Sequence, residues 1–425
     1  MYLPCSIKQG ITIFLIFDVR MINNVTNTDK INFTPTNPED RIAQIDILRG
    51  FALFGVLLVN SFGYNSSFFD FGGFYRAFDD PLNSTIFNLV IGFVADKFIF
   101  IFSFLFGMGF SMMYLKYGNN ESQFFRLYLR RMLVLMLFGI IHITFFWAGD
   151  ILLSYSLMGI IMLLLRKQSS KVLLTLSGFF YFFPIIYIAF QSKFPALPDA
   201  LSSTANIKMQ DVIAIYSKGS FSQIFSLRIS EFLAFRNINL IYYAPKVLSL
   251  FLLGSLFFKH HFLDRINANI RNFSILAIFL FLTGLQLTIH IDDIVNMLAN
   301  PDTNSFYMAV YMGVYEVTNI FLGFSYILTI LILTQISVFS KILNPLKYIG
   351  RTALTNYLLQ TIIFTTIMYS YGLGRFGSFQ PWQLIIYTVI IFAVQIIISK
   401  VWLQFFRFGP FEWIWRKLTY FRNKL

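Results

Sequence analysis

Long apolar runs constrain this chain more than any other feature of its sequence. Several stretches of 18 or more residues carry almost no charge, and each is long enough to cross the hydrocarbon core of a bilayer as a helix. Of the 425 residues, 57% are hydrophobic and 12% are charged, which is about half the charged fraction of a soluble protein. The alternating ten-residue segments of a membrane β-barrel do not occur. The sequence therefore predicts an all-α, polytopic integral membrane bundle.

The apolar runs from Arg41 onward predict about ten transmembrane helices. We expect them at about residues 47–63, 84–115, 127–147, 151–165, 172–190, 240–258, 272–290, 306–338, 352–371 and 382–404. The second and the eighth are longer than a bilayer requires, so each must be tilted, broken or extended beyond the membrane.

The charges of the short loops predict the orientation of the bundle. With a cytoplasmic N-terminus, the inner segments hold twenty Lys and Arg residues, whereas the short outer loops hold only Arg76 and Arg375. The opposite orientation would reverse this ratio, so the positive-inside rule predicts that both termini are cytoplasmic. Most of the net charge of +13 is then explained by topology, and we expect the partners to be the bilayer and a small-molecule substrate, with no nucleic acid.

The chain divides into four regions along its length. Residues 1–40 form a lead that we expect to be disordered or mis-annotated, because a true start at Met21 would leave only the polar stretch Asn23–Asp40, and residues 41–190 form an N-terminal membrane region. Residues 191–239 form a long outer loop in which Val212–Phe225 suggests a short surface helix. Residues 240–425 form a second membrane region.

Metal and disulfide chemistry are not expected. The single cysteine, Cys5, excludes intramolecular disulfides and thiolate metal clusters. His260 and His261 stand beside Lys259 without carboxylates at ligand spacing, so we interpret them as part of a solvated loop. Glycine-rich phosphate loops, serine-nucleophile elbows and dinucleotide fingerprints do not occur either.

His142 and Asp150 flank the predicted turn between the third and fourth spans. An ionisable group at a helix centre costs ~2.5–3.5 kcal/mol on insertion scales, and less near an end, so a bilayer protein has little structural reason to keep one. The structural alternatives are a histidine that hydrogen-bonds across helices and an aspartate that caps a helix. We interpret the pair as a functional site.

Other polar residues also fall at membrane depth or at helix ends. Asp46 and Arg49, three residues apart on one helix face, open the first span, where they form either a salt bridge or part of a site. Asp96 and Lys97 fall near mid-membrane, where an ion pair made only for packing is uncommon. Three more candidates lie near the outer side, namely Asn60, the interfacial Trp147 and Tyr155.

These residues carry a resemblance to a known family. The run Asp46-Ile47-Leu48-Arg49-Gly50, ending in Asn60, resembles the opening helix of bacterial YeiB-type membrane proteins. The resemblance continues through Lys97-Phe98, His142, Trp147-Ala148-Gly149-Asp150, Gly350-Arg351-Thr352-Ala353-Leu354-Thr355-Asn356-Tyr357-Leu358-Leu359-Gln360 and Gly409-Pro410-Phe411-Glu412-Trp413. It covers nearly all of residues 41–420 and implies a multi-pass protein of the bacterial cytoplasmic membrane, with a C-terminal domain of unknown function over residues 240–425.

The N-terminal half is also similar to transmembrane acyltransferases of the heparan-alpha-glucosaminide N-acetyltransferase type. These open with an Asp-x-x-Arg-Gly helix and carry an Ala-Asp pair at the second span, here Ala95-Asp96. The similarity implies transfer of an acetyl group from cytoplasmic acetyl-CoA to an acceptor on the far side of the membrane. In that group an essential histidine follows the first helix. This chain has none between Arg49 and Asp96; its four are His142, His260, His261 and His290, and the similarity then implies that His142 takes that role from a neighbouring helix.

The first hypothesis is therefore acyl transfer across the membrane, with acyl-CoA as donor and no permanently bound cofactor. A basic cytoplasmic mouth of Arg49, Arg130, Arg131 and Arg351 would hold the polyanionic donor. His142 would be the general base, Asp150 would fix its tautomer, and Lys97 or Asn60 would stabilise the oxyanion. The residues expected to bind substrate are Asp46, Arg49, Asn60, Asp96, Trp147, Tyr155, Arg351, Asn356 and Gln360.

Two other functions are compatible with the sequence. A small-solute transporter would use Asp96, Lys97 and His142 as a proton relay. Inverted repeats and paired broken helices, which such proteins contain, are not clear in this sequence, although the two overlong spans leave room for breaks. A non-catalytic membrane scaffold would need none of these side chains.

Overall fold

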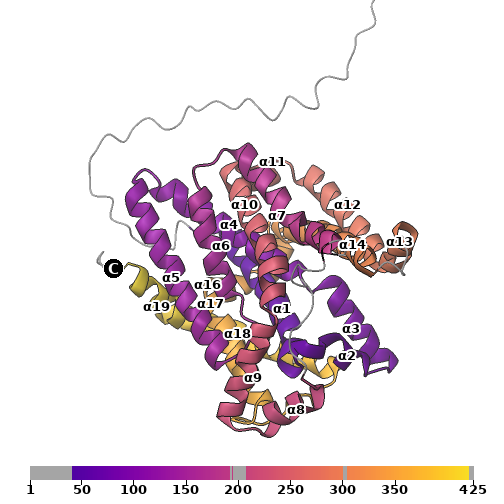
Figure 1. Ribbon diagram of the computed structural model, residues 1–425. Coiled ribbons are helices and arrows are strands. Elements are labelled where there is room, and N and C mark those ends of the chain that lie inside the picture. The colour runs from indigo at the N-terminus through magenta and orange to yellow at the C-terminus, as the bar shows by residue number, and fades with distance from the viewer. Residues whose placement is uncertain (1–40, 192–193, 195–206, 300–303, 421–425) are drawn as a thin grey trace, which may run out of the picture.

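The described part of the chain consists of helices joined by short connections, with no strand among the described residues. The structure, a computed structural model, describes residues 41–191, 194, 207–299 and 304–420, so the predicted lead at 1–40 lies outside it (Figure 1). The long segments are α1 (Ala43–Asn65), α3 (Pro81–Phe93), α4 (Lys97–Tyr117), α5 (Glu121–Phe145), α6 (Leu152–Leu165), α7 (Ser170–Gln191), the π-helix η4 (Ile238–Tyr243) with α10 (Ala244–Lys259), α12 (Ile270–Ile289), α14 (Asn304–Leu333), α17 (Ala353–Met368) and α18 (Pro381–Phe405). Shorter elements join or cover them: η3 (Phe68–Asp70), α2 (Phe71–Arg76), α8 (Met209–Lys218), α9 (Phe221–Ala234), α11 (Phe262–Ala268), α13 (Ile291–Leu298), α15 (Ser337–Leu343), α16 (Leu346–Arg351) and α19 (Pro410–Thr419).

These helices confirm the predicted fold class. Within the described residues, seven helical segments are long and apolar enough to cross a membrane, and α6 and α17 are shorter apolar helices. Each of the ten predicted stretches has a helical counterpart. The third stretch corresponds to α5, which carries more charged residues than the seven apolar segments and is not among them. The eighth stretch ends earlier than predicted, at Leu333, and residues Ser337–Leu343 form the separate helix α15.

The overlong second span is broken. α3 ends at Phe93, α4 begins at Lys97, and the intervening Asp96 adopts a backbone φ of +63°, a conformation that residues other than glycine rarely adopt. Neither proline nor glycine lies at the break. The break therefore depends on contacts of the surrounding helices, and it places Asp96 at the start of α4.

The centre of the bundle is the seam between α4 and α10. A Cβ atom added to Gly107 would lie 2.0 Å from the carbonyl oxygen of Phe251, and one added to Gly254 would lie 1.9 Å from that of Phe104. Both helices therefore approach backbone to backbone, as small residues allow in membrane bundles. Since α1 also contacts α16, α17 and α18, helices from both sides of the 191–239 loop pack into one bundle.

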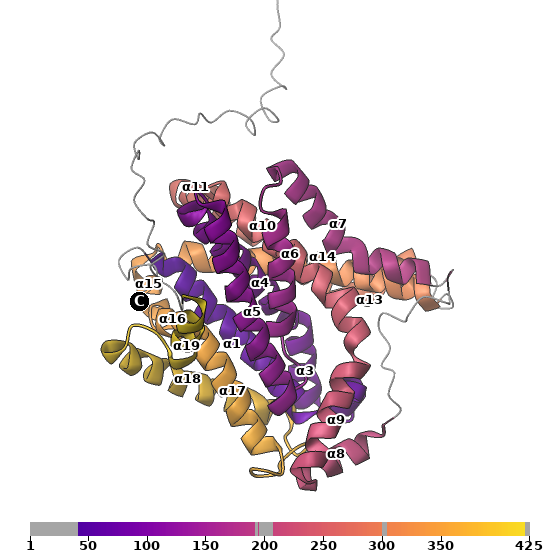
Figure 2. The same cartoon turned by 60° about the vertical axis from the view of Figure 1, so that its left-hand side comes forward.

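Two short helices of the long loop cover one end of the bundle, opposite α11 (Figure 2). The sequence predicted one surface helix here, and the structure has two, α8 and α9. Arg228 of α9 donates from Nη1 to the carbonyl oxygen of Thr144 at 2.8 Å. Glu231 accepts hydrogen bonds from Ser67 and, at 2.5 Å, from the Tyr216 hydroxyl. These buried contacts fasten the cap to α5 and to the end of α1.

Widening the α4–α10 seam is expected to destabilise the whole bundle. Gly254→Ala places a methyl group against the backbone of α4, so the helices must separate, at a cost of about 1–3 kcal/mol. Thermal unfolding in detergent measures the effect. Gly178→Ala on α7 is the matched control, because a Cβ there meets nothing within 4 Å. Equal melting temperatures for the two variants would contradict the close approach.

The cap formed by α8 and α9 is expected to be more stable in mild acid than in mild base. Burial raises the pKa of Glu231 from its usual 4.5 to about 7, so the folded chain binds this proton more tightly than the unfolded chain. The stabilisation is full below about pH 4.5 and is lost as the pH rises through about 7. It amounts to at most about 3 kcal/mol. Glu231→Gln should remove this pH dependence of cap hydrogen exchange, whereas Asp264→Asn, at a side chain that is 77% exposed, should not.

Candidate functional site

His142 and Asp150 meet inside the bundle. His142 lies in the last turn of α5, and Asp150 lies in the short connection to α6. His142 Nδ1 and Asp150 Oδ1 are 3.0 Å apart, in an ion-pair contact that is not aligned as a hydrogen bond, and both side chains are buried. The second carboxylate oxygen of Asp150 accepts the N–H of Leu153 at 2.7 Å. Asp150 therefore both begins α6 and faces the imidazole.

The other imidazole nitrogen faces a chain of hydroxyl groups. His142 Nε2 lies 2.9 Å from Thr361 Oγ1, which lies 2.7 Å from the hydroxyl of Tyr64. Asn60 lies beside that same hydroxyl. Trp147, expected at the membrane interface, is instead only 4% exposed and packs on the Tyr64 ring at 4.4 Å. With its Nδ1 proton turned to Asp150, His142 would accept at Nε2, which is the arrangement of a general base.

A cavity of about 590 Å³ opens between α1, α4, α5, α16 and α19. Six basic residues line it: Arg41, Arg49, Lys116, Arg131, Arg351 and Arg416. Glu412 is the one carboxylate among the described lining residues, and its oxygens accept from the N–H and the hydroxyl of Thr355. This basic cavity is therefore strongly positive.

The cations of the basic cavity lie close enough to repel one another. Burial lowers the pKa of Arg41, and the charges of Arg351 and Arg49 lower it further against the opposing effect of Asp46. Burial and the charge of Arg131 lower the pKa of Arg416 to about 10. Asp46, 2.8 Å from Arg49 and 3.5 Å from Arg41, offsets only part of this repulsion. A bound anion would relieve the remainder.

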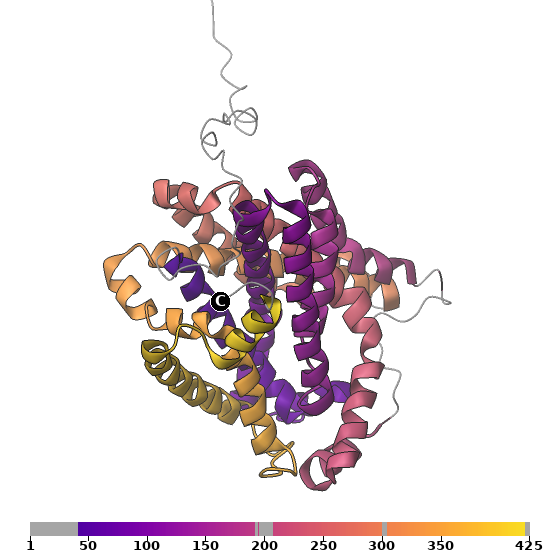
Figure 3. The same ribbon diagram turned by 90° about the vertical axis from the view of Figure 1, so that its left-hand side faces the viewer.

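The C-terminal helix forms one wall of the basic cavity. Figure 3 shows α19, in yellow, lying across the purple helices of the N-terminal half. Trp415 donates from Nε1 to the carbonyl oxygen of Arg131 at 2.9 Å, and the Arg131 guanidinium lies 3.8 Å above the Trp415 ring. Arg130, which the sequence placed in the same basic mouth, instead donates to the carbonyl oxygen of Thr419 and does not line the cavity.

The inner end of the basic cavity reaches the aromatic wall in front of His142. Tyr155 lines it and lies 2.7 Å from Ser103 through its hydroxyl. Tyr357 also lines it, and its ring centroid is 5.3 Å from that of His142. The Tyr357 hydroxyl lies near the N–H of Ile151, and its proton has no acceptor among the described residues. Tyr357 thus belongs to both the cavity and the histidine site.

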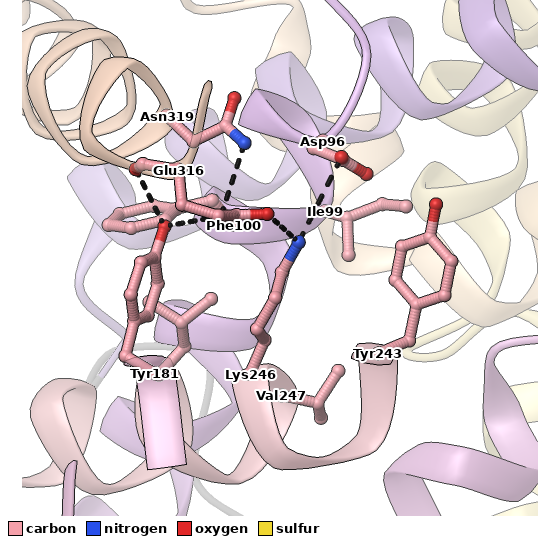
Figure 4. A pocket seen from close by; sticks show the side chains of 10 residues that line it. Asp96, Ile99, Phe100, Tyr181, Tyr243, Lys246, Val247, Glu316 and Asn319 are labelled. Carbon is pink, nitrogen blue, oxygen red and sulfur yellow. Dashed lines mark hydrogen bonds and ion pairs between the residues drawn. The ribbon is translucent and has the colours of Figure 1, made fainter. Parts of the chain in front are cut away.

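Lys97 and Asp96 belong to a different cluster. Figure 4 shows Asp96 beside Lys246 and Glu316 in a small cavity of about 10 Å³. Lys97 is fully buried, its Nζ is 3.4 Å from the carbonyl oxygen of Ile91, and Asp96, Glu316 and Lys246 are its charged neighbours. The contacts of His142 include none of these residues. The structure thus separates two groups that the sequence placed in one site.

Comparison with known proteins places the chain in a family. A family model described as protein of unknown function (DUF418) matches residues 257–422. The uncharacterized protein YxaH of Bacillus subtilis (strain 168) is 32% identical over 404 residues, which cover 91% of this chain and 96% of YxaH. The chain belongs to the YeiB-type DUF418 family.

Further relatives extend this YeiB-type family match over most of the chain. The uncharacterized protein YeiB of Escherichia coli (strain K12) is 29% identical over 403 residues, which cover 89% of this chain and 96% of YeiB. An uncharacterized 39.9 kDa protein from the amylase 3' region of Bacillus acidopullulyticus is 29% identical over 396 residues, covering 92% of this chain and 96% of its own. No solved structure matches the chain significantly. The predicted resemblance to YeiB-type proteins is thereby confirmed.

Two polar residues of the YeiB-type C-terminal motif lie outside both cavities. Asn356 donates to the carbonyl oxygen of Thr352 and to Ser399, and Gln360 donates to Gln395 at 2.9 Å. These amides hold α17 against α18. By contrast Arg351, from the same motif, lines the basic cavity, and its Nε has no hydrogen-bond partner among the described residues.

The sequence did not single out Lys246 or Glu316. Each is an isolated charge within a predicted apolar span, and that isolation is the signal that would have identified them. Among the described residues, no group of three or more potential metal ligands occurs. His260 lies 3.2 Å from the Ser170 hydroxyl, and His261 is exposed.

A cysteine placed in the basic cavity is expected to react faster with an anionic reagent than with a cationic one. In a Cys5→Ser background, Gly109→Cys adds a side chain that lines the cavity and meets nothing within 4 Å. The rates of modification by negatively and positively charged methanethiosulfonates measure the local potential. Added salt and Arg351→Gln should each reduce the ratio of the rate with the negatively charged reagent to the rate with the positively charged one. Gly178→Cys on α7 is the control, and equal rates at Gly109→Cys would refute a positive cavity.

Proposed function

We propose that this protein transfers an acyl group from a cytoplasmic acyl-CoA-type thioester to an acceptor on the opposite side of the membrane. The observation that carries the proposal is the position of Tyr357. Tyr357 lines the basic cavity, and its ring centroid lies 5.3 Å from that of the His142 imidazole. The basic cavity and the histidine–aspartate pair are therefore joined by a single side chain.

The basic cavity suits both ends of such a donor. Guanidinium groups bind phosphates in bidentate fashion, and the cavity presents five of them with one lysine. Its other walls are largely apolar and include Phe102, Leu105, Phe106 and Met112. The phosphates would lie against the arginines, and the acyl thioester would point toward Tyr155 and Tyr357. On the predicted topology, the mouth of this cavity faces the cytoplasm.

The chemistry would begin at the acceptor. His142 Nε2 would remove a proton from the acceptor amine or hydroxyl through the Thr361 hydroxyl, which lies 2.9 Å from it. The acceptor would add to the thioester carbonyl carbon to give a tetrahedral oxyanion. The carbon–sulfur bond would then break, and the imidazolium would return its proton to the leaving thiolate, which gives the acylated acceptor and the free thiol of the donor. Asp150 would orient the ring and stabilise its charged form.

The oxyanion needs a hydrogen-bond donor beside the cavity. Lys97 or Asn60 was the predicted donor, but the contacts of Lys97 lie in the other cluster. The proposal therefore assigns this role to the Tyr357 hydroxyl, whose proton has no acceptor among the described residues. Asn60 reaches the site only through Tyr64. Asp46 would position Arg49 for the donor.

The alternative functions have less support. A transporter with Asp96, Lys97 and His142 as one relay would need those groups in contact, and their hydrogen bonds and ion pairs do not join them. Uptake of a solute driven by a pH gradient, without CoA, would favour this alternative. A scaffold would tolerate alanine at both His142 and Lys97.

The proposal predicts CoA release that depends on His142. The purified protein in liposomes is given radiolabelled acetyl-CoA and a panel of amine and hydroxyl acceptors. His142→Ala should lower the rate by roughly 10²–10⁴-fold, as expected for loss of a general base. His290→Ala, at a side chain that is 51% exposed, is the matched control. Arg351→Gln should raise the KM for the donor more than it lowers kcat.

Two outcomes would count against acyl transfer. One is CoA release that His142→Ala leaves unchanged. The other is the absence of acyl transfer across the panel, together with a failure of CoA to protect a cysteine at position 109 from modification. Protection without transfer would retain the donor site and reject the acceptors tested.

A further inference from the structure

The cluster around Glu316 holds four charged side chains inside the bundle. Asp96 and Lys97 stand at the break before α4, Lys246 lies in the first turn of α10, and Glu316 lies within α14. Lys97 and Glu316 are 0% exposed, and Lys246 is 6% exposed. Charges at this depth are expensive unless they are paired, and they mark ion or proton pathways.

Lys246 is the lysine with a firm partner. Its Nζ donates to Glu316 at 2.5 Å and lies 3.9 Å from Asp96. Glu316 also accepts from Tyr242, from Tyr181 at 3.0 Å and from Asn319 at 3.2 Å (Figure 4). Four donors therefore meet one carboxylate, and the Lys246 amine is one of them.

Lys97 lacks such a partner. No carboxylate oxygen of the described residues lies within 4.0 Å of its Nζ. Its contacts are the carbonyl oxygen of Ile91 at 3.4 Å and the face of the Tyr315 ring at 4.6 Å. Both contacts tolerate either an ammonium or a neutral amine. The two lysines of this cluster are therefore held very differently.

We propose that Lys97 is a membrane-embedded proton-binding site. With Lys97 neutral, the ionised Asp96, Glu316 and Lys246 leave the cluster with one net negative charge. A proton taken from water onto the Lys97 amine neutralises that charge, and its release restores it. Burial favours the neutral amine and the negative cluster favours the ammonium, so two large opposing effects make the proton exchangeable.

The surroundings of Lys97 include a place for water and a contact through which its charge acts on a neighbouring helix. The small cavity beside Asp96, about 10 Å³, has room for one water molecule, and the Asp96 side chain is 14% exposed. The titratable groups that face Lys97 and its neighbours are Asp96 of α4, Tyr181 of α7, Tyr242 and Tyr243 of η4, Lys246 of α10, and Tyr315 and Glu316 of α14. Since Lys97 bonds back to α3 across the break, its charge bears on the junction of α3 and α4. This inference is independent of acyl transfer.

Charge movement after a pH jump tests the proposal. Proteoliposomes adsorbed on a solid-supported membrane electrode are stepped from about pH 9.5 to about pH 6.5, a range in which an exposed lysine with a pKa of about 10.4 stays mostly charged. The wild-type protein should give a transient current as protons enter the bundle. Lys97→Met, which is never charged, and Lys97→Arg, which is always charged, should both lose it. Lys167→Met, at a side chain that is 62% exposed, should keep it.

The two Lys97 variants separate proton binding from a structural role. If Lys97 were needed only for its positive charge, Lys97→Arg would give the same current as the wild type. A current retained in Lys97→Arg would therefore overturn the proposal. So would a wild-type protein that gives no current. Thermal unfolding of each variant in detergent verifies its fold, and because the arginine variant preserves the charge, it remains informative if Lys97→Met does not fold.

Discussion

A charge buried in a helical membrane bundle must find a partner within a few ångströms, and this requirement organises the present structure. Desolvation costs several kcal/mol per ion, and only close opposite charges or several hydrogen bonds offset it. Lys246 meets the requirement through Glu316 on another helix, and Asp150 meets it through the N–H of Leu153 and the imidazole of His142. The helices that carry each pair are thereby fixed to one another as well as packed.

The basic cavity is the exception to this rule. Its cations have one intrahelical carboxylate, Asp46, and a second, Glu412, that is already occupied by Thr355. Folding brings these like charges together through α1, α4, α5, α16 and α19, so the packing energy of five helices offsets their repulsion. A bound anion would reduce this repulsion and so stabilise the folded bundle further. Lys97 apart, the buried lysine and the histidine described above face carboxylates, so the unbalanced positive charge of this cavity fits the anionic donor proposed above.

The sequence predicted the fold well because membrane helices are specified locally. The length of each apolar run identified a helix, and Asp150 could be expected near His142 because only a short turn separates them. Contacts between distant helices were not accessible in this way. Lys246 and Glu316 are 70 residues apart, so their pairing had no local signature. Arg130 and Arg131 are adjacent in sequence, yet the helical turn between successive residues sends one into the basic cavity and the other to the Thr419 carbonyl oxygen. Lys97 was correctly marked as unusual and was assigned to the wrong neighbours for the same reason.

The position of α19 has a consequence for biosynthesis. Trp415 and Arg416 complete the wall of the basic cavity, and they lie in α19, which follows the other helices of this wall in the sequence. The other helices are therefore synthesised first, and the wall is complete only once α19 has been made and Trp415 has packed against Arg131. A chain truncated before α19 would therefore retain the other helices of the bundle but lack one wall of the basic cavity.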